Sequence, residues 1–213
     1  IYLVYNQKKR YNNYMAYQSF YRTYRPKSFD EVVGQKTIIK TLKNALKNDK
    51  IGHAYLFSGP RGTGKTTLAR LFAKALNCDE GLGHECNKCD SCEAILSGTH
   101  PDVYELDAAS NSGVDNIREL IDQVRYEPIM GRYKVYIIDE VHSMTSNAFN
   151  ALLKTLEEPP AHVIFILATT EPQKVLPTIL SRVQRFDFSK ISDDDLISKM
   201  EYVLKQENVN YEI

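Results

Sequence analysis

One glycine-rich segment, Gly59 to Thr66, constrains the fold more than any other part of this 213-residue chain. It reads Gly-Pro-Arg-Gly-Thr-Gly-Lys-Thr, follows the apolar run Ala54–Phe57, and precedes a helical pattern over residues 65–77. Glycines at this spacing can adopt positive φ, so consecutive amides can turn inward and form a concave anion site. A following helix adds its free N–H groups and its dipole. The segment therefore predicts a strand–loop–helix unit that binds nucleotide phosphates.

Two residues of this loop have side chains suited to binding a nucleotide and its metal ion. Lys65 can reach the β- and γ-phosphates as a point charge, and the Thr66 hydroxyl is placed to bind Mg²⁺. A chance glycine-rich turn is the alternative, and the flanking strand and helix patterns argue against it. The expected nucleotide-binding residues of the loop are Gly59, Pro60, Arg61, Gly62, Thr63, Gly64, Lys65, Thr66 and Thr67.

Strand and helix patterns alternate along the rest of the chain, which predicts an α/β fold with a parallel sheet flanked by helices. Composition agrees, because 43% hydrophobic and 25% charged residues are ordinary globular values. Zero net charge excludes a uniformly basic nucleic-acid-binding coat, and no apolar run is long enough to predict a membrane partner. Besides the segments named above, strands are expected at Val103–Leu106, Val135–Ile138, Val163–Leu167 and Arg185–Phe188, and helices at 35–48, 114–126, 146–157 and 175–180.

Polar residues at strand ends are further candidates for catalysis. Asp139 and Glu140 follow the apolar strand Val135–Ile138, at the end where parallel sheets bind ligands. Asp139 would hold Mg²⁺ through its water shell, and Glu140 would orient and deprotonate an attacking water. Thr170 could contact the γ-phosphate or that water, although threonine is also common in strands. Arg182 could neutralise charge on a phosphoryl group of a neighbouring subunit, although a lone arginine is more often a surface group.

The four cysteines, Cys78, Cys86, Cys89 and Cys92, fall within fifteen residues. Their spacing matches a closed tetrahedral zinc site, which would be structural because no position is left for water. An iron–sulfur cluster and disulfide bonds are the alternatives, and disulfides suit a secreted protein. The clustering indicates a metal and a reducing compartment, the cytoplasm. Because the cluster interrupts the α/β alternation, we expect a small zinc-binding knob over residues 78–92 on the surface.

The two ends of the chain differ from its middle in composition and in sequence pattern. Residues 1–14 are rich in tyrosine and lack an initiator Met, so we expect a disordered or non-native extension before a natural start at Met15. An N-capped amphipathic helix pattern begins at Ser192 and extends to the end. Nothing follows for its apolar face to pack against. We therefore expect an α/β domain over 15–188 and the start of a truncated helical lid over 189–213.

Longer motifs around these residues resemble a known family. The chain is similar to the gamma/tau subunits of bacterial DNA polymerase III, the ATPase motors of the sliding-clamp loader, over about residues 16–213. Besides the phosphate loop and the cysteines, four segments carry the resemblance: Tyr24–Gln35, Ile137–His142, Phe149–Pro160 and Ala168–Lys174. The resemblance implies a P-loop NTPase fold of the AAA+ type that hydrolyses ATP to ADP and phosphate. It also implies ATP, Mg²⁺ and a structural Zn²⁺ as cofactors.

The same resemblance implies partners and residue roles. A motor subunit of this family works in a hetero-pentamer with other loader subunits and loads the sliding clamp onto primer–template DNA. A non-hydrolysing scaffold subunit is the alternative. Thr170 matches the family's sensor position and Arg182 its trans-acting arginine finger, although Val183 stands where the family usually has Cys.

Two further sets of residues follow from the resemblance. The expected adenine-pocket residues are Tyr24, Arg25, Pro26, Val32 and Val33. The candidate DNA contacts are Asn111, Ser112 and Arg118, for which helix capping and an ordinary surface charge are the alternatives.

Overall fold

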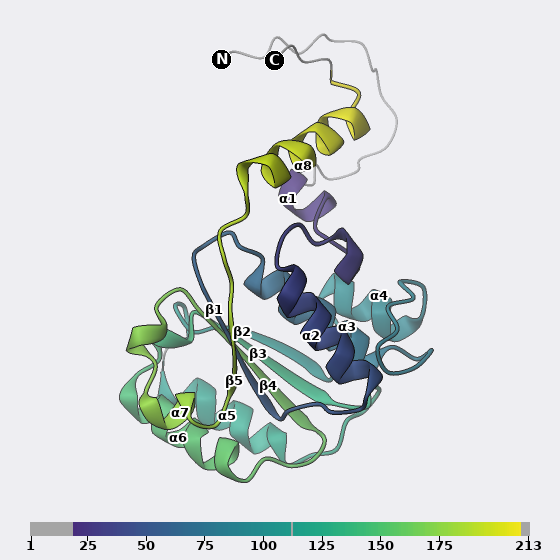
Figure 1. Cartoon of the computed structure of the whole chain (residues 1–213). Helices are drawn as coiled ribbons and strands as arrows, with labels where there is room; N and C mark the ends of the chain where they lie inside the picture. Colours follow the sequence, from purple (N-terminus) through teal and green to yellow (C-terminus); the bar gives the residue numbers. More distant parts are fainter. Residues whose placement is uncertain (1–18, 112, 210–213) are drawn as a thin grey trace, which may run out of the picture.

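Five parallel strands form one sheet in this computed structural model, which describes residues 19–111 and 113–209 (Figure 1). The strand order is β2-β3-β4-β1-β5. The strands are β1 (Ala54–Ser58), β2 (Val103–Asp107), β3 (Lys134–Asp139), β4 (Val163–Thr169) and β5 (Gln184–Asp187). Each predicted strand is therefore confirmed to within two residues. The central position of β1, β3 and β4 explains why they are buried along almost their whole length and why their middle residues are apolar.

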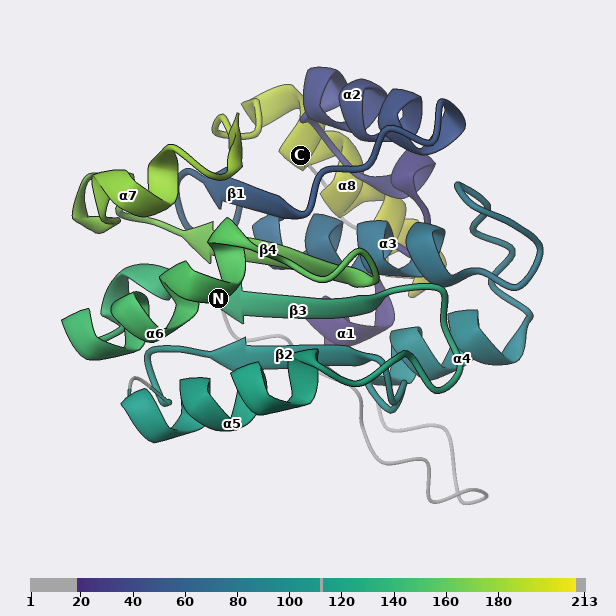
Figure 2. The ribbon, with the colours of Figure 1, turned by 90° about the horizontal axis from the view of Figure 1, so that it is seen from below.

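Helices cover both faces of the sheet (Figure 2). Side chains such as Tyr55 and Ile137 pack on one face with α2 and α3, and Leu56 and Phe165 pack on the other with α5, α6 and α7. This division follows from the alternation of side chains along each strand. The bounds are α2 (Lys36–Lys47), α3 (Lys65–Asn77), α5 (Val114–Val124), α6 (Ser146–Glu157) and α7 (Pro177–Leu180). The predicted parallel α/β fold is thus confirmed.

Three helices lie outside this alternation: α1 (Phe20–Thr23), α4 (Asp90–Ser97) and α8 (Asp193–Gln206). The Ser192 hydroxyl accepts the Asp195 N–H and begins α8, as its sequence predicts, but the helix ends at Gln206. Figure 1 shows α8 and α1 together, away from the sheet. The expected extension over residues 1–14 lies outside the described residues. Within the described residues, no helix has the length and apolar character needed to cross a membrane.

Candidate nucleotide and metal sites

The ends of three neighbouring strands bring the predicted polar residues to one edge of the sheet. The phosphate loop leaves β1, Asp139 ends β3, and Thr170 follows β4, which pairs with both other strands. A cavity of about 360 Å³ lies at this edge. It is lined by Arg25, Arg61, Gly62, Gly64, Lys65, Thr66, Thr67, Asp107, Asp139 and Glu140. The structure therefore places the loop and the acidic pair in a single site.

Backbone geometry explains the glycines and the lysine of the phosphate loop. Gly64 has φ of +92° and stands directly before α3, so the first N–H groups of that helix lie at the cavity. A Cβ on Gly59 would come within 2.4 Å of the Phe188 carbonyl oxygen, so only glycine fits there. The Lys65 Nζ donates to the carbonyls of Gly59 at 2.8 Å and Pro60 at 2.9 Å. Burial lowers the pKa of Lys65.

Thr66 and Asp139 meet at the base of the same cavity. The Thr66 hydroxyl donates to Asp139 Oδ2 at 2.5 Å, and Asp139 Oδ1 accepts the Glu140 N–H at 2.9 Å. A hydroxyl in contact with a carboxylate supplies the hard oxygen ligands that Mg²⁺ prefers. The residues present therefore fit a magnesium ion, with Thr66 and Asp139 as its protein groups.

The Glu140 carboxylate contacts Thr170, which follows β4, and His142, which follows β3. Glu140 has φ of +48°, and its Oε2 accepts the Thr170 hydroxyl at 3.1 Å. His142 Nδ1 lies 3.4 Å from the same oxygen and 3.0 Å from the Thr169 hydroxyl. His142 Nε2 lies 3.3 Å from Glu171. Sequence reasoning missed His142, for which the only signal was a polar residue two positions beyond the acidic pair.

Two more residues at the site were missed from the sequence. Asp107 ends β2 and lines the cavity, and a carboxylate at the end of a predicted strand could have identified it. Gln35 is buried with φ of +54°, and its amide donates to the carbonyls of Ser189 at 2.7 Å and Thr63 at 3.4 Å. Gln35 therefore links the phosphate loop to the segment that leads into α8. No local pattern marks that role.

The residues expected in the adenine pocket lie in different surroundings. Arg25 lines the phosphate cavity, and Pro26 lines a small pocket beside it. Tyr24 faces α8 instead, because its hydroxyl donates to Glu207 at 2.6 Å, a bond that raises the pKa of Tyr24 to about 12. Val32 packs against the core beside α2, and Val33 is half-buried. Contact of these residues with adenine stays a prediction.

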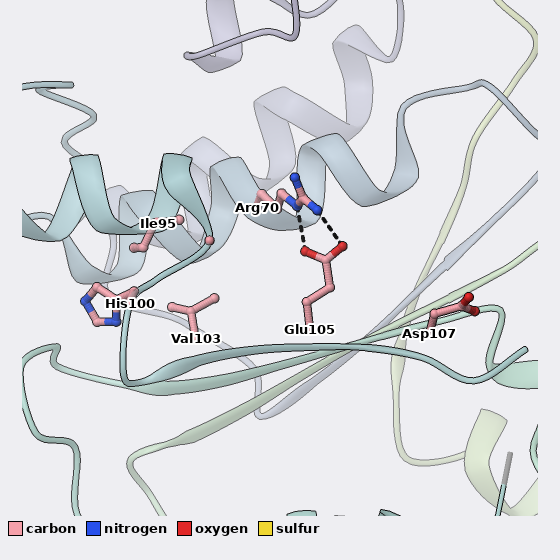
Figure 3. Close-up of a pocket in the computed structure, with 7 residues that line it drawn as sticks. Arg70, Ile95, His100, Val103, Glu105 and Asp107 are labelled. Carbon is pink, nitrogen blue, oxygen red and sulfur yellow. Dashed lines mark hydrogen bonds and ion pairs between the residues drawn. The ribbon is translucent and has the colours of Figure 1, made fainter. Parts of the chain in front are cut away.

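A second pocket, of about 340 Å³, adjoins the phosphate cavity at Asp107 (Figure 3). The Arg70 guanidinium and the Glu105 carboxylate point toward each other there and form two hydrogen bonds of 2.6 Å. Paired, bidentate geometry of this kind is among the stronger side-chain contacts. The pair ties α3, the helix that follows the phosphate loop, to strand β2 and so fixes one wall of the site.

Arg182 lies away from the phosphate cavity of its own chain. It follows α7, and its guanidinium contacts Glu157 at 2.7 Å and the Thr178 carbonyl at 2.6 Å. A residue that acts on a neighbouring subunit must be presented elsewhere on the surface, and this position meets that requirement. Its role in a neighbouring site stays a prediction.

The candidate DNA contacts are engaged in local structure. The Asn111 side chain donates to the Asp107 carbonyl at 3.1 Å, and Arg118 pairs with Asp115 at 3.4 Å. Ser112 lies outside the described residues. The Arg118 contact matches the alternative interpretation of an ordinary surface charge. The Asn111 contact is not a helix cap, because the N-cap of α5 is Gly113 and no side chain caps it. DNA contact stays a prediction.

The four cysteine sulfur atoms form one compact group, all within 4.8 Å of one another. The Sγ atoms of Cys78 and Cys89 are 4.0 Å apart, and those of Cys86 and Cys92 are 3.9 Å apart. Zn–S bonds of about 2.3 Å in a tetrahedron place sulfur atoms about 3.8 Å apart, so this donor set fits zinc. The spacing excludes disulfide bonds in this structure, since those need sulfur atoms about 2 Å apart. An iron–sulfur cluster, which distributes four cysteines over two or four iron atoms, fits this compact spacing less well.

Most residues of the cysteine loop are exposed or half-buried, as expected for a knob on the surface, but two of the cysteines are buried. Cys78 directly follows α3, and Cys92 lies in α4. Both cysteines are fully buried. Helix α4 was not predicted from the sequence. Burial raises the pKa of the Cys92 thiol, and a bound cation would favour its thiolate form.

We expect metal removal to destabilise the fold. Chelation should lower the melting temperature by about 5–10 °C, because metal binding to such a site contributes to the free energy of folding. Differential scanning fluorimetry with the metal content measured in parallel tests this. The expectation is wrong if the melting temperature stays the same after the metal is removed. If chelation instead abolished DNA binding and left the fold stable, the cysteine loop would be a nucleic-acid-binding module.

A family model described as "DNA polymerase III, delta subunit" matches residues 34–192. The chain is 55% identical over 199 residues to DNA polymerase III subunit tau of Bacillus subtilis, covering 93% of this chain and 35% of that protein. It is 49% identical to subunit tau of Escherichia coli, covering 93% of this chain and 31% of that protein. The chain therefore spans about a third of the length of these relatives.

Solved structures give the same fold. RuvB of Thermotoga maritima, described as a Holliday junction branch migration motor, matches with a TM-score of 0.63 at 23% identity, over 88% of this chain and 56% of that one. A DNA polymerase III gamma subunit-related protein of the same organism matches with a TM-score of 0.52 at 26% identity, over 78% and 51%. The likeness to RuvB supports a P-loop NTPase fold.

Proposed function

Because this chain belongs to the family that the DNA polymerase III delta-subunit model describes, we propose that it is an ATP-binding and ATP-hydrolysing motor subunit of a clamp loader. Its relatives are named tau and gamma subunits of DNA polymerase III. In this proposal the chain assembles with other loader subunits into a hetero-pentamer, and the complex loads a sliding clamp onto primer–template DNA during replication.

The observation that most directly supports the proposal is that a phosphate loop and an acidic pair line the same cavity. Lys65 and Thr66 enter it from the start of α3, and Asp139 and Glu140 enter it from the end of β3. These groups suit different tasks of one reaction: Lys65 suits phosphate binding, Thr66 and Asp139 suit Mg²⁺ binding, and Glu140 suits activation of water. A site that only bound phosphate would not need Glu140.

Each residue then has a defined task. Lys65 exchanges its two loop carbonyls for phosphate oxygens when ATP enters. Thr66 and Asp139 hold Mg²⁺, which when bound offsets the negative charge of the phosphates. Glu140 accepts a proton from the attacking water, and Thr170 fixes the orientation of its carboxylate. Arg182 of one subunit stabilises charge at the site of the next.

A non-hydrolysing scaffold subunit is the second candidate. It would share the fold and would still bind nucleotide. Lys65, Thr66, Asp139 and Glu140 are all present in the cavity or at its base, which favours the motor.

ATP turnover by a loader reconstituted with this chain tests the choice. We expect turnover to rise strongly when sliding clamp and primed DNA are added together, compared with either alone. Bound ATP without stimulated turnover would support the scaffold subunit instead. Absence of ATP binding would contradict both candidates.

A further inference from the structure

The loop that carries the cysteines also contacts the N-terminal segment, residues 24–33. Glu85 directly precedes Cys86, and its Oε2 accepts the backbone N–H of Phe29 at 3.0 Å. Phe29 is buried in the core beside α2, and burial raises the pKa of Glu85. A hydrogen bond in such surroundings is costly to lose, because the Phe29 N–H would be left without a partner in the interior.

Lys74 makes a second link between the same two segments. Its side chain leaves α3 and is fully buried. The Nζ donates to Oδ1 of Asn87, which directly follows Cys86, and also to the backbone carbonyl of Lys27. A buried ammonium group needs such acceptors, because a buried charge without partners strongly destabilises the fold. The cysteine loop and the backbone of Lys27 therefore both accept hydrogen bonds from the buried ammonium group of Lys74.

The N-terminal segment leads from these links to the phosphate cavity. Arg25, two residues before Lys27, lines the cavity. Gln35, just beyond the segment, donates to the carbonyl of Thr63 in the phosphate loop. A displacement of residues 27–29 would therefore move one wall of the cavity and one support of the loop.

We propose that a metal ion at the four cysteines positions segment 24–33 through Glu85, Asn87 and Lys74, and so raises the affinity of the phosphate cavity for ATP. These three are positioning residues, since none of them lines the cavity. The inference rests on the proposed function only in requiring that the cavity binds ATP. Because coupling between two binding sites is reciprocal in free energy, ATP should strengthen binding of the metal. We expect the tighter binding to appear as slower release of the metal.

Asn87→Gly is the most selective variant, because glycine keeps the left-handed backbone at this position, where φ is +59°. It removes the Asn87 acceptor of Lys74, which is the one that belongs to the cysteine loop, and leaves the Lys27 carbonyl and all four cysteines in place. In the full chain loaded with zinc, we expect one zinc ion to be retained and the Kd for a fluorescent ATP analogue to rise about fivefold or more. Amide hydrogen exchange over residues 24–33 should also become faster.

Lys88→Ala is the matched control. Lys88 is the next residue in the same loop, its side chain is 75% exposed, and it pairs with Glu80 rather than with the N-terminal segment. We expect this variant to keep the wild-type zinc content, ATP-analogue Kd and hydrogen exchange. Glu85→Ala, which removes the acceptor of the Phe29 N–H, replaces Asn87→Gly if the latter fails to fold.

A second measurement, on the unmodified chain, complements the variants. Zinc release to a colorimetric chelator should be slower with saturating ATP than without it. The inference is wrong if ATP leaves that rate unchanged and the ATP-analogue Kd is the same for wild type and the positioning variants. In that case the proposed function still stands. If no form of the chain binds the analogue, the proposed function fails as well.

Discussion

Replacing Glu140 by Gln will leave ATP binding near the wild-type level and lower ATP hydrolysis by about 10²–10⁴-fold, the range expected for loss of a general base. Glutamine keeps the size of the side chain and can still accept the Thr170 hydroxyl, but it cannot take a proton from water. The test is single-turnover hydrolysis by the assembled loader, with the Kd for ATP measured on the same protein. Glu119→Gln is the control, because Glu119 is an exposed residue of α5 outside the cavity.

Two outcomes would contradict the role of Glu140 as the general base. Unchanged turnover would show that another group activates the water. An equal loss of ATP affinity would show that Glu140 holds the nucleotide rather than the water.

Replacing Arg182 by Ala will lower turnover of the assembled loader by about 10³–10⁵-fold and leave ATP affinity of the separate chain unchanged. We expect the ATP affinity to stay unchanged because Arg182 contacts Glu157 and lies outside the cavity of its own chain. To act on a neighbour, the guanidinium must leave Glu157. Exposed ion pairs are worth only about 0–1 kcal/mol, so this release is a small cost.

Arg185→Ala is the matched control for that experiment. Arg185 lies three residues further on, is exposed, and pairs with Asp187. The trans-acting role of Arg182 would be contradicted if its replacement weakened ATP binding by the separate chain, or if both arginine variants lowered turnover equally.

The parts of this structure that could be predicted are those set by local pattern. The strands β1, β3 and β4 are buried on both faces, which left an unbroken apolar signal in each. The phosphate loop and Asp139 were predictable because the carboxyl ends of parallel strands converge at one edge. In the folded chain, Thr66 and Asp139 are in direct contact.

Long-range contacts and unusual capping set the limits of that prediction. Helix α4 was missed because it is short and because Cys89 caps it, its sulfur accepting the Cys92 N–H, whereas usual caps have side-chain oxygens. Gln35 contacts Ser189, 154 positions away, and Lys74 bridges two distant loops. Such partners are brought together by the folded sheet and helices, so neither residue carries a local signal of its role.

Calorimetric titration of the chain with Mg²⁺ and ATP tests the central claim, that the phosphate cavity is an ATP site, most directly. We predict one ATP bound per chain, and an affinity about tenfold or more lower in Lys65→Ala, because that variant loses a charged hydrogen-bond donor to phosphate. No binding by the wild-type chain, or equal affinity of wild type and variant, would contradict the claim.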